Sequence, residues 1–105
     1  MPVEQPAYGI VRIMVSIRTA TERAIAFAQE ALGADRTTGI RLEEVESTAI
    51  DGEDAWFITL SMINPDPDGG TLALLGAGKR EYKSFTVLKR DGEVKSMKIR
   101  ELANV

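Results

Sequence analysis

Residues 55–63 read AWFITLSMI, and a large apolar side chain falls at every second position of this stretch. Such a period of two is typical of an extended strand with one buried face. Aromatic and β-branched residues, which favour strands, are also frequent here. The residues expected to face the core are Trp56, Ile58, Leu60 and Met62.

A tight turn and another strand precede this stretch. Asp51 and Gly52 form an Asp-Gly pair, which is typical of two-residue hairpin turns. Residues 40–50, IRLEEVESTAI, have the composition of a strand, but Leu42 and Val45 do not fit a strict period of two. We therefore expect a β-bulge between them, since one extra residue restores the alternation.

A single helix is expected over residues 19–33. Thr19 and Glu22 form a capping box, in which the glutamate reaches back to the threonine amide. Gly33 suits the left-handed position that follows a helix. The expected apolar stripe is rich in alanine, so the helix could lie close to a sheet. It consists of Ala24, Ile25, Ala28, Ala31 and Leu32.

Three further strands complete the expected fold. Residues 10–18, IVRIMVSIR, alternate like an edge strand, with Met14 on its exposed side. Residues 80–89 and 94–100 would form a hairpin around the turn at residues 90–92. The inward-facing residues of this hairpin would be Phe85, Val87, Met97 and Ile99.

The expected order is therefore β-α-β-β-β-β. This order predicts an α+β fold in which one helix packs on a curved antiparallel sheet of four to five strands. The 105 residues, 44% of them hydrophobic and 28% charged, fit a single domain. We expect residues 1–8 to be irregular.

The long connection over residues 64–79 opens with NPDPDGG, which looks like the start of an EF-hand calcium loop. The twelfth position of such a loop must be a bidentate glutamate, and here it is Leu75. An ordinary turn is the simpler interpretation, and a weak surface cation site at Asp66 and Asp68 is the alternative. We expect no metal and no cofactor.

The same connection is unusually long for a hairpin, and long loops are often functional. Its apolar residues either fold back over an open end of the sheet or form a docking surface for a partner. These residues are Leu72, Leu74 and Leu75.

The composition offers few side chains that are suited to catalysis. The chain has no cysteine and no histidine, which removes the thiolate nucleophile and the commonest general base. Glu43, Glu44 and Glu46 crowd one strand, and repulsion between Glu44 and Glu46 on one face could raise a pKa. A solvated strand that faces basic neighbours is the simpler interpretation, so we expect no catalytic residues.

Charge is unevenly distributed along the chain. Residues 1–78 carry a net charge of −7 and residues 79–105 a net charge of +4. Nucleic-acid binding by the basic end is one interpretation. Because the whole chain is acidic, we favour cross-strand pairing and protection of a sheet edge by lysines, and expect no nucleic acid. The sequence shows neither a signal-peptide pattern nor a membrane-spanning stretch, so a cytoplasmic location is expected.

Four segments together resemble a PepSY domain, within the broader cystatin-like architecture: ERAIAFAQEALG, LEEVE, WFITLSM and EYKSFTVLKRDGEV. The resemblance implies a regulatory or inhibitory role toward peptidases. The cystatin inhibitory motif Gln-x-Val-x-Gly is absent, so inhibition through that wedge is not expected. The matching residues are Ala24, Ile25, Ala28, Tyr82, Val87, Asp91, Gly92, Glu93 and Val94.

The sequence therefore predicts a non-enzymatic protein-interaction domain, a regulator or inhibitor of a partner protein. The alternative is a small-ligand-binding module that uses the hollow between helix and sheet. The expected partner-binding residues are Met14 of the first strand, with Leu72, Leu74 and Leu75 of the loop. A homodimer through the first strand is also expected, because an edge strand can pair with a second copy.

Overall fold

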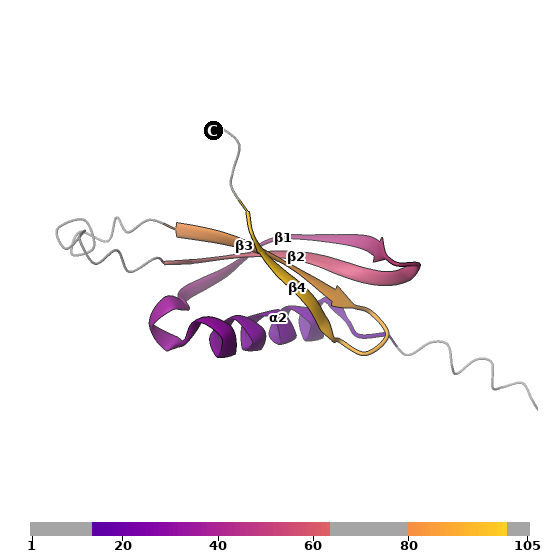
Figure 1. Cartoon of the computed structure of the whole chain (residues 1–105), viewed down its shortest axis with the longest axis horizontal. Coiled ribbons are helices and arrows are strands. Elements are labelled where there is room, and N and C mark those ends of the chain that lie inside the picture. The colour runs from indigo at the N-terminus through magenta and orange to yellow at the C-terminus, as the bar shows by residue number, and fades with distance from the viewer. Residues whose placement is uncertain (1–13, 64–79, 101–105) are drawn as a thin grey trace, which may run out of the picture.

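The computed structural model describes residues 14–63 and 80–100. In them, one helix packs on one face of a four-stranded antiparallel sheet, so the fold is α+β (Figure 1). The helix is α2 (Ile17–Leu32), and the short 3-10 helix η1 (Ala34–Arg36) follows it. The strands are β1 (Thr38–Ile50), β2 (Glu53–Ile63), β3 (Arg80–Leu88) and β4 (Val94–Ile99), and they are neighbours in this order.

The start of the helix corrects the expected first strand. Residues 14–16 belong to no strand, and Ile17 already begins α2. The N-cap is Ser16, whose side chain accepts a hydrogen bond of 3.1 Å from the Thr19 amide, so Thr19 is not the cap. The cap at Ser16 adds Ile17 and Arg18 to the first turn of the helix, which favours a helix over a strand there. Residues 10–13 lie outside the described residues.

The β1–β2 hairpin has the turn and the bulge that the sequence predicts. Asp51 and Gly52 have φ values of 51° and 81°, as a tight turn of this kind requires. The pairing of β1 with β2 shifts register between Leu42 and Glu44, which confirms the bulge. Beyond it, Glu44 pairs with Thr59, and Glu46 pairs with Phe57.

The core lies between α2 and the sheet. Its central members are completely shielded from solvent: Ala20, Ala24, Ala28, Ile58, Leu60, Met62, Phe85 and Val87. Phe27 of the helix meets Phe85 edge to face, with 6.4 Å between ring centroids. Trp56 and Met97 are half-buried against this cluster. The predicted inward faces of β2 and β3 are thus confirmed.

Ile99 departs from its expected burial. It pairs with Lys83 and lies on the same face of β4 as Met97, but it is 75% exposed. The reason is its position at the end of an edge strand, where only β3 lies beside it. The second edge of the described sheet is β1, not the segment before the helix.

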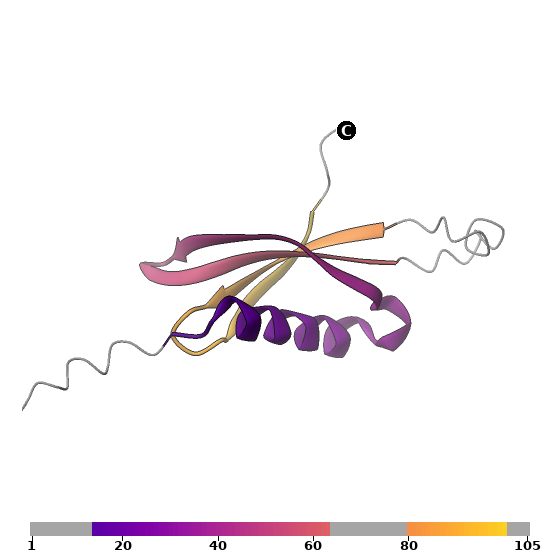
Figure 2. The same cartoon turned by 180° about the vertical axis from the view of Figure 1, so that it is seen from behind.

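A charged network joins η1 to the helix-facing side of β3. Arg36 donates from Nη2 to both carboxylate oxygens of Glu81, at 3.1 and 3.2 Å. Lys83 Nζ lies 3.4 Å from the same carboxylate and is only 7% exposed. This network closes one end of the core, while no described element covers the opposite face of the sheet (Figure 2). Among the described residues no helix is long and apolar enough to cross a membrane.

Candidate functional site

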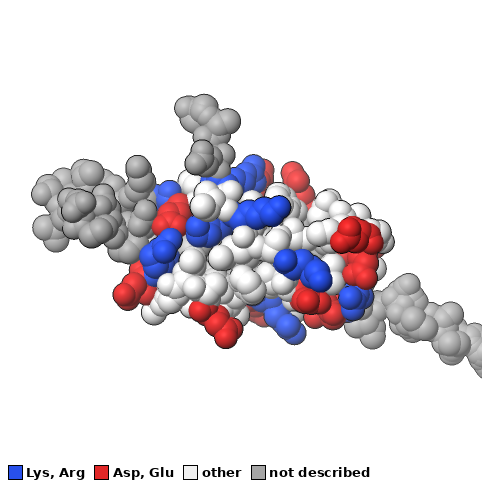
Figure 3. All heavy atoms as spheres, in the orientation of Figure 1, with Lys and Arg blue, Asp and Glu red and all other residues white. Residues whose placement is uncertain are grey.

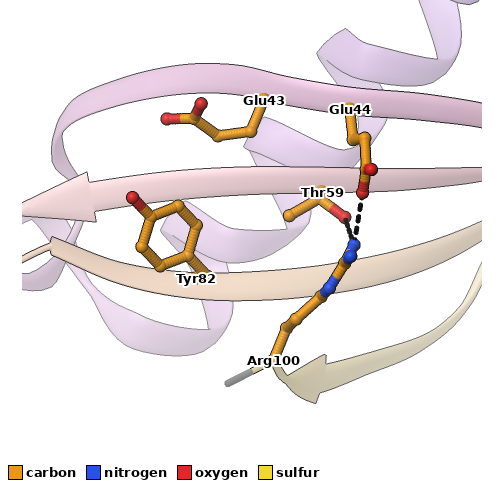
Figure 4. Close-up of a pocket in the computed structure, with 5 residues that line it drawn as sticks. All are labelled: Glu43, Glu44, Thr59, Tyr82 and Arg100. Carbon is orange, nitrogen blue, oxygen red and sulfur yellow. Dashed lines mark hydrogen bonds and ion pairs between the residues drawn. The ribbon is translucent and has the colours of Figure 1, made fainter. Parts of the chain in front are cut away.

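The uncovered face of the sheet holds an open pocket of about 250 Å³ (Figure 4). The chain brings residues of β1, β2 and β3 together there with the residue that follows β4. The backbone amide of Arg100 donates to Tyr82 O at 2.8 Å, which carries the β3–β4 pairing one residue further. The lining residues are Glu43, Glu44, Thr59, Tyr82 and Arg100.

Arg100 ties the strands together across this pocket. Its Nη1 donates to Thr59 Oγ1 at 2.8 Å and forms an ion pair with Glu44 of β1 (Figure 4). Thr59, which is 2% exposed, lies 3.4 Å from the Ser84 hydroxyl. The guanidinium therefore neutralises Glu44 and connects three strands of the sheet.

Glu43 is the second carboxylate of the pocket, and it points away from Arg100 (Figure 4). Ser61 Oγ donates to it at 2.6 Å, and Arg80 donates to Ser61 Oγ at 2.8 Å. The Ser61 hydrogen bond, followed by the charges of Arg41 and Arg80, holds the pKa of Glu43 below its ordinary value. Glu43 is thus ionised at neutral pH and is not poised to donate a proton.

The pocket only partly matches the expected acidic cluster. Glu44 and Glu46 share a sheet face, as predicted, because they pair with alternate residues of β2. The pocket, however, brings Glu44 together with Glu43. Carboxylate repulsion was suggested for Glu44 and Glu46 and stays a prediction, while Glu43, which lines the pocket, has a lowered pKa. Among the described residues no group of His, Cys, Asp and Glu side chains could hold a metal ion.

The lowered pKa of Glu43 predicts a pH dependence of stability. When a carboxyl group has a lower pKa in the folded state than in the unfolded state, its ionisation stabilises the fold. This contribution is fully present above the unfolded-state pKa and is lost as the pH falls through the folded-state pKa. We expect Ser61→Ala to raise the pKa of Glu43 toward its ordinary value, because the largest cause of the shift is removed. A carboxyl NMR titration measures it. An unchanged pKa in Ser61→Ala would contradict this assignment, and Glu43→Gln identifies the signal.

A second surface lies where β4 borders the helix. We call it the β4 edge surface. It consists of the unpaired side of β4 and of three apolar residues, Phe27, Met97 and Ile99. Phe27 is 36% exposed, and Ile99 is the most exposed large apolar residue of the described chain. In Figure 3, Lys and Arg spheres gather where β4 runs, beside an uncharged area.

Of the expected partner-binding residues, the structure describes only Met14, which is not part of this surface. Met14 is 49% exposed, but it precedes the helix and is not in a strand. Its neighbour Val15 donates its amide to Lys89 O at 2.7 Å and accepts from Trp56 Nε1 at 3.1 Å. The loop leucines, and the aspartates of the weak cation site, lie outside the described residues. The β4 edge surface could have been suspected from the run KSMKI of the last strand, in which Met97 and Ile99 stand at alternate positions and two lysines are close by.

Compared with known proteins, the chain matches no family model, no curated protein and no solved structure. The PepSY-like resemblance therefore stays a prediction.

Proposed function

We propose that the chain is a non-enzymatic protein-interaction domain that binds its partner through the β4 edge surface. The observation that carries the proposal is the 75% exposure of Ile99, on the same face of an edge strand as half-buried Met97. Apolar side chains beside unpaired strand edges are sites where another chain can add. A regulatory or inhibitory role toward the partner fits the PepSY-like resemblance.

Small-ligand binding between helix and sheet ranks second. The eight central residues of that interface have no exposed surface, so little space for a ligand is left among them. The pocket on the uncovered face is the better place for a small ligand. Its carboxylates, however, are already paired with Arg100 and with the Ser61 and Arg41 side chains.

Affinity capture from the native host tests the proposal, with Ile99→Asp compared with Leu42→Asp. Leu42 is a matched control because it is also exposed, at 46%, but lies on the opposite edge of the sheet. We expect a stoichiometric partner to be retained by the wild type and by Leu42→Asp and lost with Ile99→Asp, because a buried charge prevents apolar contact. Equal retention by both variants, or no stoichiometric partner, would argue against this surface.

Self-association stays a prediction, although residues 14–18 do not form the strand through which it was expected. Sedimentation of the wild type and Ile99→Asp distinguishes a second copy from a different protein as the partner. A dimer that dissociates with Ile99→Asp would make the partner a second copy. A monomer at high concentration would leave only a different protein.

A further inference from the structure

We infer that the β4 edge surface binds an extended, acidic segment of a partner protein, which adds to the sheet as a strand beside β4. This inference rests on the proposed function and specifies the conformation and the charge of the partner. Three features carry it: the direction of the β4 amides, the apolar residues on one face, and the lysine on the other.

The backbone of β4 has hydrogen-bonding groups that the described chain leaves unpaired. Arg100 donates its amide to Tyr82 O, and the pairs Lys98 with Ser84 and Ser96 with Thr86 continue this register. In an antiparallel pair, alternate residues turn their N–H and C=O groups toward the neighbour. Met97 and Ile99 therefore turn theirs away from β3, where no described strand lies (Figure 1).

The two faces of an added strand would contact different kinds of side chain. On the helix side it would contact Met97, Ile99 and Phe27, so the partner's side chains there should be apolar. On the other side it would meet Lys98, which is exposed and forms no ion pair with another described residue. Opposite charges across neighbouring strands are favourable, so the partner should carry acidic residues at these alternate positions.

A further cation lies at the turn end of β4. The Arg23 side chain packs over Gly92, where an added Cβ would lie 3.5 Å from it. Lys95 is also on β4, and its ion pair with Glu93 is long, at 3.7 Å. Because Lys95 and Arg90 are paired with Glu93 and Asp91, the excess positive charge along this edge comes from Lys98 and Arg23, and it favours an acidic segment.

A second copy of the chain fits this edge less well. Two β4 strands side by side would bring their lysines close together, and like charges are unfavourable there. The other edge strand, β1, shifts register twice along its pairing with β2, whereas β4 shifts only once, at its turn end, so that residues 96–99 form the more regular edge for a further strand. Glu44 of β1 is also engaged by Arg100.

Binding of two end-blocked octapeptides tests the inference. One alternates valine with glutamate and the other alternates valine with lysine. We expect the glutamate peptide to bind several-fold more tightly than the lysine peptide, with NMR shifts at Met97 and Ile99. Lys98→Glu should weaken it about two- to fivefold, since exposed charge pairs are modest, and should favour the lysine peptide. Equal binding of both peptides to the wild type, or shifts confined to β1, would overturn the inference.

The pair Ile99→Pro and Ile99→Ala separates the backbone contribution from the side chain. Both variants lose the isoleucine side chain, but only proline also removes the outward amide. That amide does not bond to β3, so the sheet should persist, and circular dichroism checks it. We expect proline to weaken glutamate-peptide binding about five- to tenfold more than alanine. Equal affinities in the two folded variants would exclude strand addition.

The outcomes also separate this inference from the proposed function. A host protein that is captured through Ile99, while neither octapeptide binds, would refute strand addition and leave the interaction domain standing. Loss of both would refute both.

Discussion

Phe85→Ala is expected to lower the free energy of unfolding by about 3–5 kcal/mol, the usual cost of deleting a large aromatic side chain from a core. Phe85 has no exposed surface, pairs with Ile58 on β2 and Met97 on β4, and meets the Phe27 ring. It therefore connects the helix to three strands. Small domains are typically stable by about 5–15 kcal/mol, so the loss would be a large fraction of the total.

Urea denaturation of wild type and variant measures this cost. Phe85→Leu is the control, because it keeps an apolar side chain in the site and should cost less than about 2 kcal/mol. A loss below about 1 kcal/mol in Phe85→Ala would mean that the residue is not in the core.

Trp56→Ala is expected to cost about 3 kcal/mol, at the lower end of the range for aromatic truncation, because Trp56 is half-buried. The indole also makes two polar contacts. Its Nε1 donates to Val15 O at 3.1 Å, which ties β2 to the residue before the N-cap of α2. Lys89 Nζ also lies 4.1 Å from the ring centroid, within range of a cation–π contact.

Thermal or urea unfolding measures this change. Trp56→Phe keeps one aromatic ring but loses the second ring of the indole and its N–H, so it should cost about 1–2 kcal/mol. If Trp56→Ala cost less than Trp56→Phe, this result would contradict the packing of Trp56 against the core.

Local signals were sufficient for most of the sheet. The alternation of residues 55–63 predicts the buried face of β2, and the out-of-step Leu42 and Val45 predict the bulge in β1. These features depend on neighbours in the sequence and on the period of a strand. The α+β class follows from them once a helix is recognised.

The start of the helix could not be predicted in the same way. Residues 14–18 alternate like a strand and also contain Ser16, which is a good N-cap. Both local signals are present, and the contact of the Val15 backbone with Lys89 O and Trp56 Nε1 places Ser16 where it can cap the helix. That contact depends on where the distant strands lie, so the sequence pattern alone gave the wrong element.

The two candidate surfaces could not be predicted from the sequence, for the same reason. Alternation correctly places Ile99 on the face of Met97, but its exposure depends on β4 being an edge. The sequence pointed to Glu43 and Glu44 as candidate site residues, but it did not point to the residues with which they pair. Arg100 reaches Glu44 from 56 residues away, and only the strand order brings the two together.

Amide hydrogen exchange along β4, with and without the valine–glutamate peptide, tests the central claim most directly. In the free protein we expect Ser96 and Lys98 to exchange slowly and Met97 and Ile99 to exchange fast, because only the first two face β3. Added peptide should protect Met97 and Ile99 and leave β1 unchanged. Protection of Met97 and Ile99 in the free protein, or no gain in their protection when peptide is bound, would contradict an open β4 edge that accepts a partner strand.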